Sequence, residues 1–205
     1  MSNSFSTSAG LSIIHFSNGS YARPNLGINI VSLNLGLKYR FGGTEEKVSS
    51  DIPDRDKAWK KKVMVGFGIK EIPPVKGPKY FVNSYSFNMI KPGKSKSSFG
   101  FGADLFYNSA LRDLIRTKDS AYKGNSLDYY RVGLAGIYSL DFGGISLLIE
   151  MGGYLLTQHK EQGYIYHRIT TRYQVSDKVF LNLGLKTHYA VADFAEFGIG
   201  FNIGK

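Results

Sequence analysis

The sequence predicts an all-β protein, an antiparallel transmembrane β-barrel with about ten visible strands. Three observations predict this class. Apolar residues recur at every second position in run after run, as in a strand that turns one face toward lipid or a core. The 205 residues include 24 Gly, 14 Tyr and 14 Phe, which suits a curved, closed sheet with aromatic girdles. The runs are also close to the roughly 9 to 11 residues that a tilted membrane strand needs.

The first two runs, 9–17 and 29–41, show the alternation most clearly. In the second run the large residues at odd positions are Val31, Leu33, Leu35, Leu37, Tyr39 and Phe41, and the residues between them are Ser32, Asn34, Gly36, Lys38 and Arg40. Similar runs follow at 62–70, 130–141, 145–152, 179–188 and 195–203, and weaker ones at 80–90, 98–107 and 164–173. In an outer-membrane barrel the large face meets lipid and the polar face lines the lumen. A soluble barrel is the alternative, and long strands rich in Gly and aromatic residues favour the membrane barrel.

The connections support one barrel domain over residues 1–205. Residues 141–144 and 175–178 predict tight turns, and 109–126 predicts a long polar loop on the opposite side, as in barrels with short periplasmic turns and longer outer loops. The long charged segment 42–60 is the exception, because it falls on the short-turn side. We expect it to be a solvated loop with Trp59 at a membrane interface. The sequence leaves open whether further strands precede Met1 and how the barrel closes.

Composition and charge narrow the classes of partner. No run reaches the roughly 18 to 20 apolar residues of a membrane helix, and the absence of Cys excludes disulfides and thiolate metal sites. Lys and Arg exceed Asp and Glu by 26 to 16, which favours anionic partners. The basic residues are scattered and no nucleic-acid motif accompanies them. We therefore expect outer-membrane lipids as partners, no nucleic acid, and neither metal nor cofactor. The start Met1–Phe5 lacks signal-peptide character, as expected of a processed or N-terminally truncated chain.

One polar pair interrupts the first apolar run. His15 and Ser17 lie two residues apart, so they share a strand face, and that face is the aliphatic one of Leu11 and Ile13. A serine hydroxyl becomes a good nucleophile only when a base takes its proton. Asn29 lies on the aliphatic face of the next run, so strand pairing across the loop 19–26 would bring these three polar side chains together.

These residues also resemble a known family. The segment His15-Phe16-Ser17-Asn18, followed by Pro24-Asn25-Leu26-Gly27-Ile28-Asn29, is similar to the active-site segment of the lipid A 3-O-deacylase (PagL-type) family of outer-membrane β-barrel esterases, also called acyloxyacyl hydrolases. The resemblance covers about residues 10–41, and the segment 185–198 resembles the end of longer members. It implies an outer-membrane enzyme that hydrolyses an acyl ester of lipid A or lipopolysaccharide.

The resemblance also implies roles for single residues. Ser17 would be the nucleophile, His15 the general base and Asn18 the oxyanion donor, while Asn25, in a Pro-Asn turn, would shape the loop. The third catalytic position falls on Asn29, where the family has a carboxylate. An amide can orient the imidazole ring but cannot offset its positive charge. Reduced activity, an unusual orienting geometry or a substitute acid are the consequences to expect.

Asp193 is the candidate substitute acid. It lies near the outer end of the last run, in phase with its aliphatic face, and could serve if the last strand closed against the first. Glu150 and Glu196 fall on the lumen face by phase, as do Lys186 and His188, so we expect structural roles for them. Two other functions stay open: a non-catalytic barrel that binds lipid or is structural, and a small pore or transporter.

Overall fold

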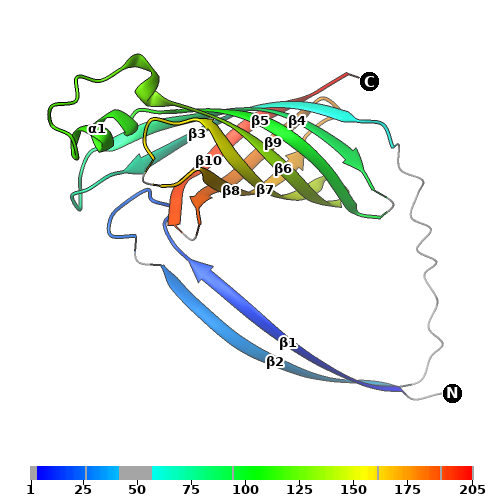
Figure 1. The fold of residues 1–205 in the computed structure, drawn as a ribbon. Helices are drawn as coiled ribbons and strands as arrows, with labels where there is room; N and C mark the ends of the chain where they lie inside the picture. Colours follow the sequence, from blue (N-terminus) through cyan, green and yellow to red (C-terminus); the bar gives the residue numbers. More distant parts are fainter. Residues whose placement is uncertain are drawn as a thin grey trace. The chain divides into compact units, whose positions relative to one another are not determined.

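The computed structural model describes residues 4–25, 27–41, 57–93, 95–160, 162–189 and 191–204. In these residues it has ten strands and two short helices (Figure 1), which confirms the all-β class. The elements are β1 (Ser4–Phe16), β2 (Ile28–Arg40), β3 (Lys60–Glu71), β4 (Lys79–Pro92), β5 (Ser97–Asn108), α1 (Leu111–Arg116), η1 (Ser126–Tyr129), β6 (Tyr130–Phe142), β7 (Ile145–Leu156), β8 (Ile165–Gln174), β9 (Val179–His188) and β10 (Val191–Ile203).

The chain divides into two compact units. One, the hairpin unit, comprises residues 1–18 and 26–53, and the other, the barrel unit, comprises 19–25 and 54–205. The expectation of a single domain over 1–205 is not tested by this division and stays a prediction.

In the hairpin unit, β1 and β2 pair antiparallel in an unbroken register from Ser4 opposite Arg40 to Phe16 opposite Ile28. Directly opposite residues share a face, so Leu11 and Leu33 stand together on one side and are 78% and 67% exposed. On the other side the Ser12 and Ser32 hydroxyls lie 2.7 Å apart. The predicted division into an aliphatic face and a small polar face is therefore confirmed.

In the barrel unit, eight antiparallel strands close in the order β10-β3-β4-β5-β6-β7-β8-β9. The predicted closed barrel is confirmed. It has eight of the ten strands, because β1 and β2 form a separate two-stranded sheet. The last strand closes against β3 through pairs that run from Ile203 opposite Lys61 to Glu196 opposite Gly68. Closure of the last strand against the first, considered from the sequence, does not occur in the described residues.

Side chains alternate across the barrel wall as predicted. Outward residues such as Phe67 and Leu183 are exposed, whereas Glu150, Arg168 and Glu196 point inward and are at most 2% exposed. The Arg168 guanidinium bonds the carboxylates of Asp104, Glu150 and Glu196. Beside this layer Phe106, Tyr154, Tyr166 and Phe194 pack against one another. Glu150 and Glu196 thus have the structural lumen positions that their phase predicts.

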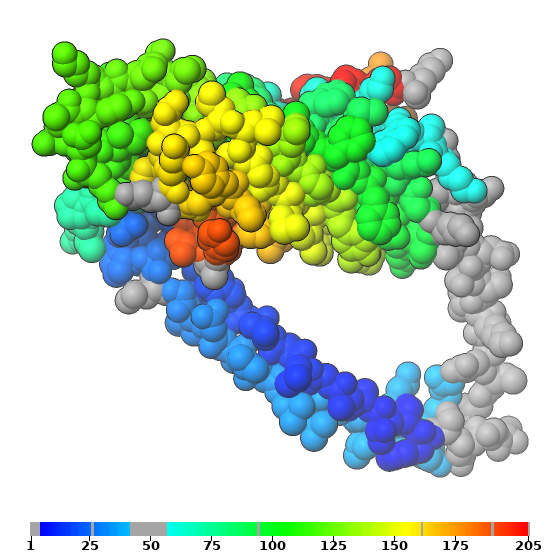
Figure 2. All heavy atoms as spheres, in the orientation of Figure 1, coloured from blue at the N-terminus to red at the C-terminus, as the bar shows by residue number. Residues whose placement is uncertain are grey.

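The two ends of the barrel differ. Tight turns at 143–144 and 175–178 lie at one end, as predicted, and the connections 72–78, 109–129 and 157–164 lie at the other, called here the long-loop end. The connection 109–129 carries α1 and η1, and Figure 2 shows its spheres gathered at the end of the barrel that bears α1, away from the chain's C-terminus. Within the described residues, no helix has the length and hydropathy needed to cross a membrane.

Part of the predicted charged loop, residues 42–56, lies outside the described residues. Trp59, at its end, is partly exposed beside the short-turn end of the barrel. Its ring packs edge-on against Phe101 at 5.5 Å, and the Lys91 ammonium lies 5.9 Å from the ring centre. An aromatic ring beside a lysine at a strand end is the arrangement found in interfacial girdles.

Candidate active site

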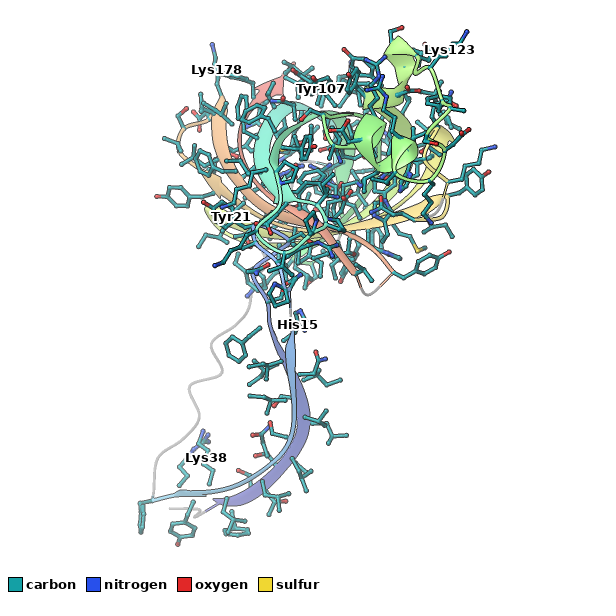
Figure 3. The ribbon with its side chains drawn as sticks, turned by 90° about the vertical axis from the view of Figure 1, so that its left-hand side faces the viewer. His15, Tyr21, Lys38, Tyr107, Lys123 and Lys178 are labelled. Carbon is teal, nitrogen blue, oxygen red and sulfur yellow. The ribbon has the colours of Figure 1, made fainter. Side chains whose placement is uncertain are left out.

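His15 and Asn29 meet directly across the hairpin. The register of β1 and β2 places them opposite each other, and His15 Nδ1 lies 2.7 Å from Asn29 Oδ1. An amide oxygen only accepts hydrogen bonds, so Nδ1 carries the proton and donates it to Asn29. In the neutral ring Nε2 is then the nitrogen without a proton, which is the tautomer that a general base needs. Figure 3 labels His15 toward one end of the hairpin and Lys38 toward the other.

Ser17 follows the last residue of β1, Phe16, and is exposed. It lies two residues after His15, as the shared-face argument requires. In the described part of the chain, no hydrogen bond joins the Ser17 hydroxyl to His15. The structure therefore brings together His15 and Asn29, and the pairing of Ser17 with His15 stays a prediction.

Gly27 makes room for the histidine ring. A Cβ atom on Gly27 would lie 2.6 Å from His15 Cε1 and 3.4 Å from Nε2, which is too close for any side chain unless the ring moves. The sequence argument used Gly27 only as part of the Pro-Asn-x-Gly turn and missed this role. Extending the register of β1 and β2 by one pair places Gly27 opposite Ser17. The same count on the sequence could have indicated that Gly27 lies beside the predicted site.

The segment 19–25 belongs to the barrel unit, where it bonds to β3 and β10. Glu71 N–H donates to the Ser20 carbonyl at 2.9 Å, the Ser20 hydroxyl donates to the Ala192 carbonyl at 2.7 Å, and Arg23 N–H donates to Glu71 Oε1 at 3.1 Å. Gly19 and Ser20 both have positive φ, 60° and 67°, a conformation that costs energy for serine. The bonds at both Ser20 oxygens offset that cost.

These bonds lie at the seam where the barrel closes. The pairing of β10 with β3 stops at Gly68, and the three residues beyond it, Ile69 to Glu71, pair with β4 alone. The segment 19–25 takes the free edge of β3 at Glu71 and also bonds β10 at Ala192. It thereby fills the open end of the seam.

The two asparagines predicted for positioning fall in different units. Asn18 belongs to the hairpin unit and Asn25 to the barrel unit, where Asn25 lines a cavity of about 210 Å³ at the long-loop end. The role of Asn18 as oxyanion donor and the role of Asn25 in shaping the loop both stay predictions. Among the residues that the structure describes, no three His, Asp or Glu side chains gather as a metal site would require.

The predicted position of Asp193 is wrong. The register of β10 against β9 shifts between Ala192 and Phe194, and such a bulge turns one residue out of phase. Asp193 and Phe194 consequently both point inward, each 1% exposed. The Asp193 carboxylate bonds the ammonium groups of Lys70 and Lys186, contacts that favour a structural role. Its use as a substitute acid is untested and stays a prediction.

Two family models match different parts of the chain. A family model described as "Acyloxyacyl hydrolase, C-terminal domain" matches residues 59–205, and one described as "Lipid A 3-O-deacylase (PagL)" matches residues 1–38. The first match covers the eight strands of the barrel, and the second covers β1, the connecting segment and most of β2. No curated protein matches the chain.

Proposed function

The chain belongs to the acyloxyacyl hydrolase and lipid A 3-O-deacylase family, and from that membership we propose that it is an outer-membrane esterase with a Ser/His mechanism. Membership implies lipid A deacylation, with lipid A as the substrate. The finer part of the proposal is the chemistry: Ser17 as nucleophile, His15 as base and Asn29 as the group that orients the base.

The hydrogen bond from His15 to Asn29 carries this proposal. With Nδ1–H held on the amide oxygen at 2.7 Å, Nε2 is ready to take the Ser17 proton as the hydroxyl oxygen attacks the acyl carbonyl. The tetrahedral oxyanion collapses, the C–O bond to the sugar breaks, and Nε2–H protonates the leaving alkoxide. Water, deprotonated by Nε2 in turn, then hydrolyses the acyl-serine to release the fatty acid and restore Ser17.

The aliphatic surroundings suit an acyl substrate. His15 and Asn29 stand on the hairpin face that also bears Ile13 and Val31, which are 75% and 69% exposed. A face of this kind is stable against lipid tails, where the acyl chains of lipid A lie. We therefore place the protein in the outer membrane, with the reacting ester meeting the hairpin from the lipid side.

The third position limits the rate. Asn29 sets the tautomer and orientation of His15, but a neutral amide does not stabilise the imidazolium that forms during attack. We expect slow turnover that still depends fully on Ser17 and His15.

The test is deacylation of lipopolysaccharide by the complete protein in a bilayer, followed by mass spectrometry of lipid A. Wild type should release one acyl chain, and Ser17→Ala and His15→Ala should release none. Ser12→Ala is the matched control, because Ser12 lies on the same strand but on the small polar face. Absence of acyl loss from wild type would overturn the proposal and leave a non-catalytic lipid-binding or structural barrel.

A pore is the less favoured alternative. Charged side chains fill the lumen, and Arg168, with its three carboxylate partners, is buried. Conduction requires a continuous water-filled path, which such a packed layer opposes.

A further inference from the structure

A polar cavity lies at the short-turn end of the barrel lumen. Its volume is about 160 Å³, and its walls come from the strands β3 to β9 and from the turn 143–144. A Cβ atom added to Gly143 or Gly144 would meet nothing within 4 Å, so open space lies beside the turn and gives a small ligand a way in. Every residue of the wall belongs to the barrel unit, and the hydrolysis proposed above uses none of them.

Three cationic side chains, those of Lys60, Lys62 and Arg172, line this cavity. Lys60 and Lys62 lie in phase with the buried Met64 on β3, so both point toward the lumen. Arg172, on β8, is only 4% exposed. The Lys62 ammonium and the Arg172 guanidinium each lie 5.1 Å from the centre of the Phe180 ring. Two cations therefore share one ring, and an anion bound beside them would relieve their mutual repulsion.

Several buried hydrogen-bond donors near these cations lack an acceptor. Arg172 donates from Nη2 to Asn88 Oδ1 at 2.7 Å and from Nε to Asn182 Oδ1 at 3.2 Å. Its Nη1 and the Nδ2 atoms of both asparagines have no hydrogen-bond partner among the residues that the structure describes. The Lys62 ammonium has three N–H groups, and within the same residues it donates to Asn202 Oδ1 alone, at 2.6 Å. Because a buried donor without an acceptor is unfavourable, a ligand that brings acceptor oxygens is stabilised here.

The carboxylates near the cavity do not supply these acceptors. Asp141, on the wall, accepts hydrogen bonds from three serine hydroxyls at 2.7 to 2.9 Å. Glu150 lies 3.7 Å from Arg172 Nη2. In the part of the chain that the structure describes, no ion pair includes Lys60 or Lys62. Even with Arg172 balanced by Glu150, two lysines face one carboxylate, so the cavity favours an anion.

We propose that this cavity binds the oxoanion of a phosphate group. The available donors belong to Arg172, Lys62 and Lys60, and a phosphate group presents at least three strong acceptor oxygens to them, whereas a carboxylate presents two. A cavity of about 150 Å³ admits benzene, so a phosphate group fits in this one. The short turns of outer-membrane barrels face the periplasm. The phosphate is therefore a free periplasmic ion or part of a phospholipid head group, two sources with the same chemistry.

Isothermal titration of the complete protein, in a phosphate-free zwitterionic detergent and buffer, measures this binding directly. Inorganic phosphate should bind saturably, and its affinity should fall as salt is added. Acetate should bind at least about tenfold more weakly, because it offers two oxygens to the same donors. Glycerol 3-phosphate identifies the source: tighter binding than inorganic phosphate would assign the site to a lipid head group, and weaker binding would assign it to the free ion. Absence of saturable phosphate binding, or equal affinity for acetate, would overturn the proposal.

Lys62→Gln removes one of the cations and should weaken phosphate binding by about tenfold. The barrel should still fold, because a glutamine amide at this position can donate to Asn202. Lys61→Gln is the matched control. Lys61 is the adjacent residue on β3, is exposed and lies outside the cavity wall, so its loss should leave binding unchanged. Equal phosphate affinities of the two variants would overturn the proposal.

Arg172→Lys tests the guanidinium at constant charge. It removes Nη1 but keeps a cation, so it should bind phosphate more weakly than wild type does. Thermal unfolding gives a second measurement: phosphate should raise the unfolding temperature of wild type and of Lys61→Gln by more than that of Lys62→Gln. Phosphate affinity as high as that of wild type in Arg172→Lys would overturn the role given to Nη1.

Discussion

Asn29 holds His15 through an amide oxygen, 2.7 Å from the ring Nδ1, at a position where a carboxylate would both orient the ring and stabilise its charge. The amide orients the ring of His15 but carries no negative charge to stabilise the imidazolium. Asn29→Asp supplies that charge without changing the size of the side chain. We expect the rate of lipid A deacylation to rise at least about tenfold, within the range of several powers of ten that a triad carboxylate contributes.

The comparison needs a variant that removes the orienting bond as well. Asn29→Ala leaves the ring free to rotate and should reduce the rate below that of wild type. Initial rates of acyl release, measured at equal protein concentration, should be highest for Asn29→Asp, intermediate for wild type and lowest for Asn29→Ala. A rate for Asn29→Asp no higher than that of wild type would show that the amide does not limit this site.

Gly27 is predicted to support catalysis because its lack of a side chain leaves room for the ring of His15. In Gly27→Ala the new methyl carbon would lie 2.6 Å from His15 Cε1, so the ring must leave its place beside Asn29. We expect at least about a tenfold loss in kcat, because small misplacements of catalytic groups have large effects on rate. Gly10→Ala is the matched control in the same hairpin, since nothing lies within 4 Å of its new methyl group. Equal activity of the two variants would contradict the role given to Gly27.

Glu71 is predicted to position the segment 19–25. Its carboxylate accepts the Arg23 N–H at 3.1 Å, and a bond of this type contributes on the order of 1 to 3 kcal/mol. Glu71→Ala should therefore loosen the segment and lower kcat. Glu71→Gln keeps an acceptor oxygen and should recover most of the activity. Hydrogen exchange at the Arg23 amide provides an independent measurement, with faster exchange expected in Glu71→Ala alone.

The sequence predicted the barrel because alternation depends on local residue types. The aliphatic and polar faces of β2, the inward phase of Glu150 and Glu196, and the turns at 143–144 and 175–178 all follow from strand periodicity and turn chemistry. The meeting of His15 with Asn29 was predictable for a related reason, because both residues fall in phase with the aliphatic faces of two strands that pair antiparallel.

What the sequence could not predict depends on contacts between distant segments. The closure of β10 on β3 joins residues more than a hundred positions apart. Ser20 bonds Glu71 and Ala192, which are also far from it in the sequence. No periodicity of residue types indicates such partners. The predicted strand face of Asp193 was wrong for a different reason. One extra residue at the bulge between Ala192 and Phe194 moves Asp193 to the other face of the sheet, and the run of alternating residues gives no sign of it.

The inward position of Asp193 leads to a prediction that distinguishes a structural residue from a substitute acid. Asp193→Asn would leave Lys70, Lys186 and Arg131 without their shared carboxylate. Breaking a buried ion pair by removing one partner typically destabilises a protein by about 3 to 5 kcal/mol, so the thermal unfolding temperature of the barrel should fall. Deacylation per folded molecule, measured below that temperature, should stay at the wild-type level. A loss of deacylation with an unchanged unfolding temperature would instead identify Asp193 as the catalytic carboxylate that replaces the one absent at Asn29.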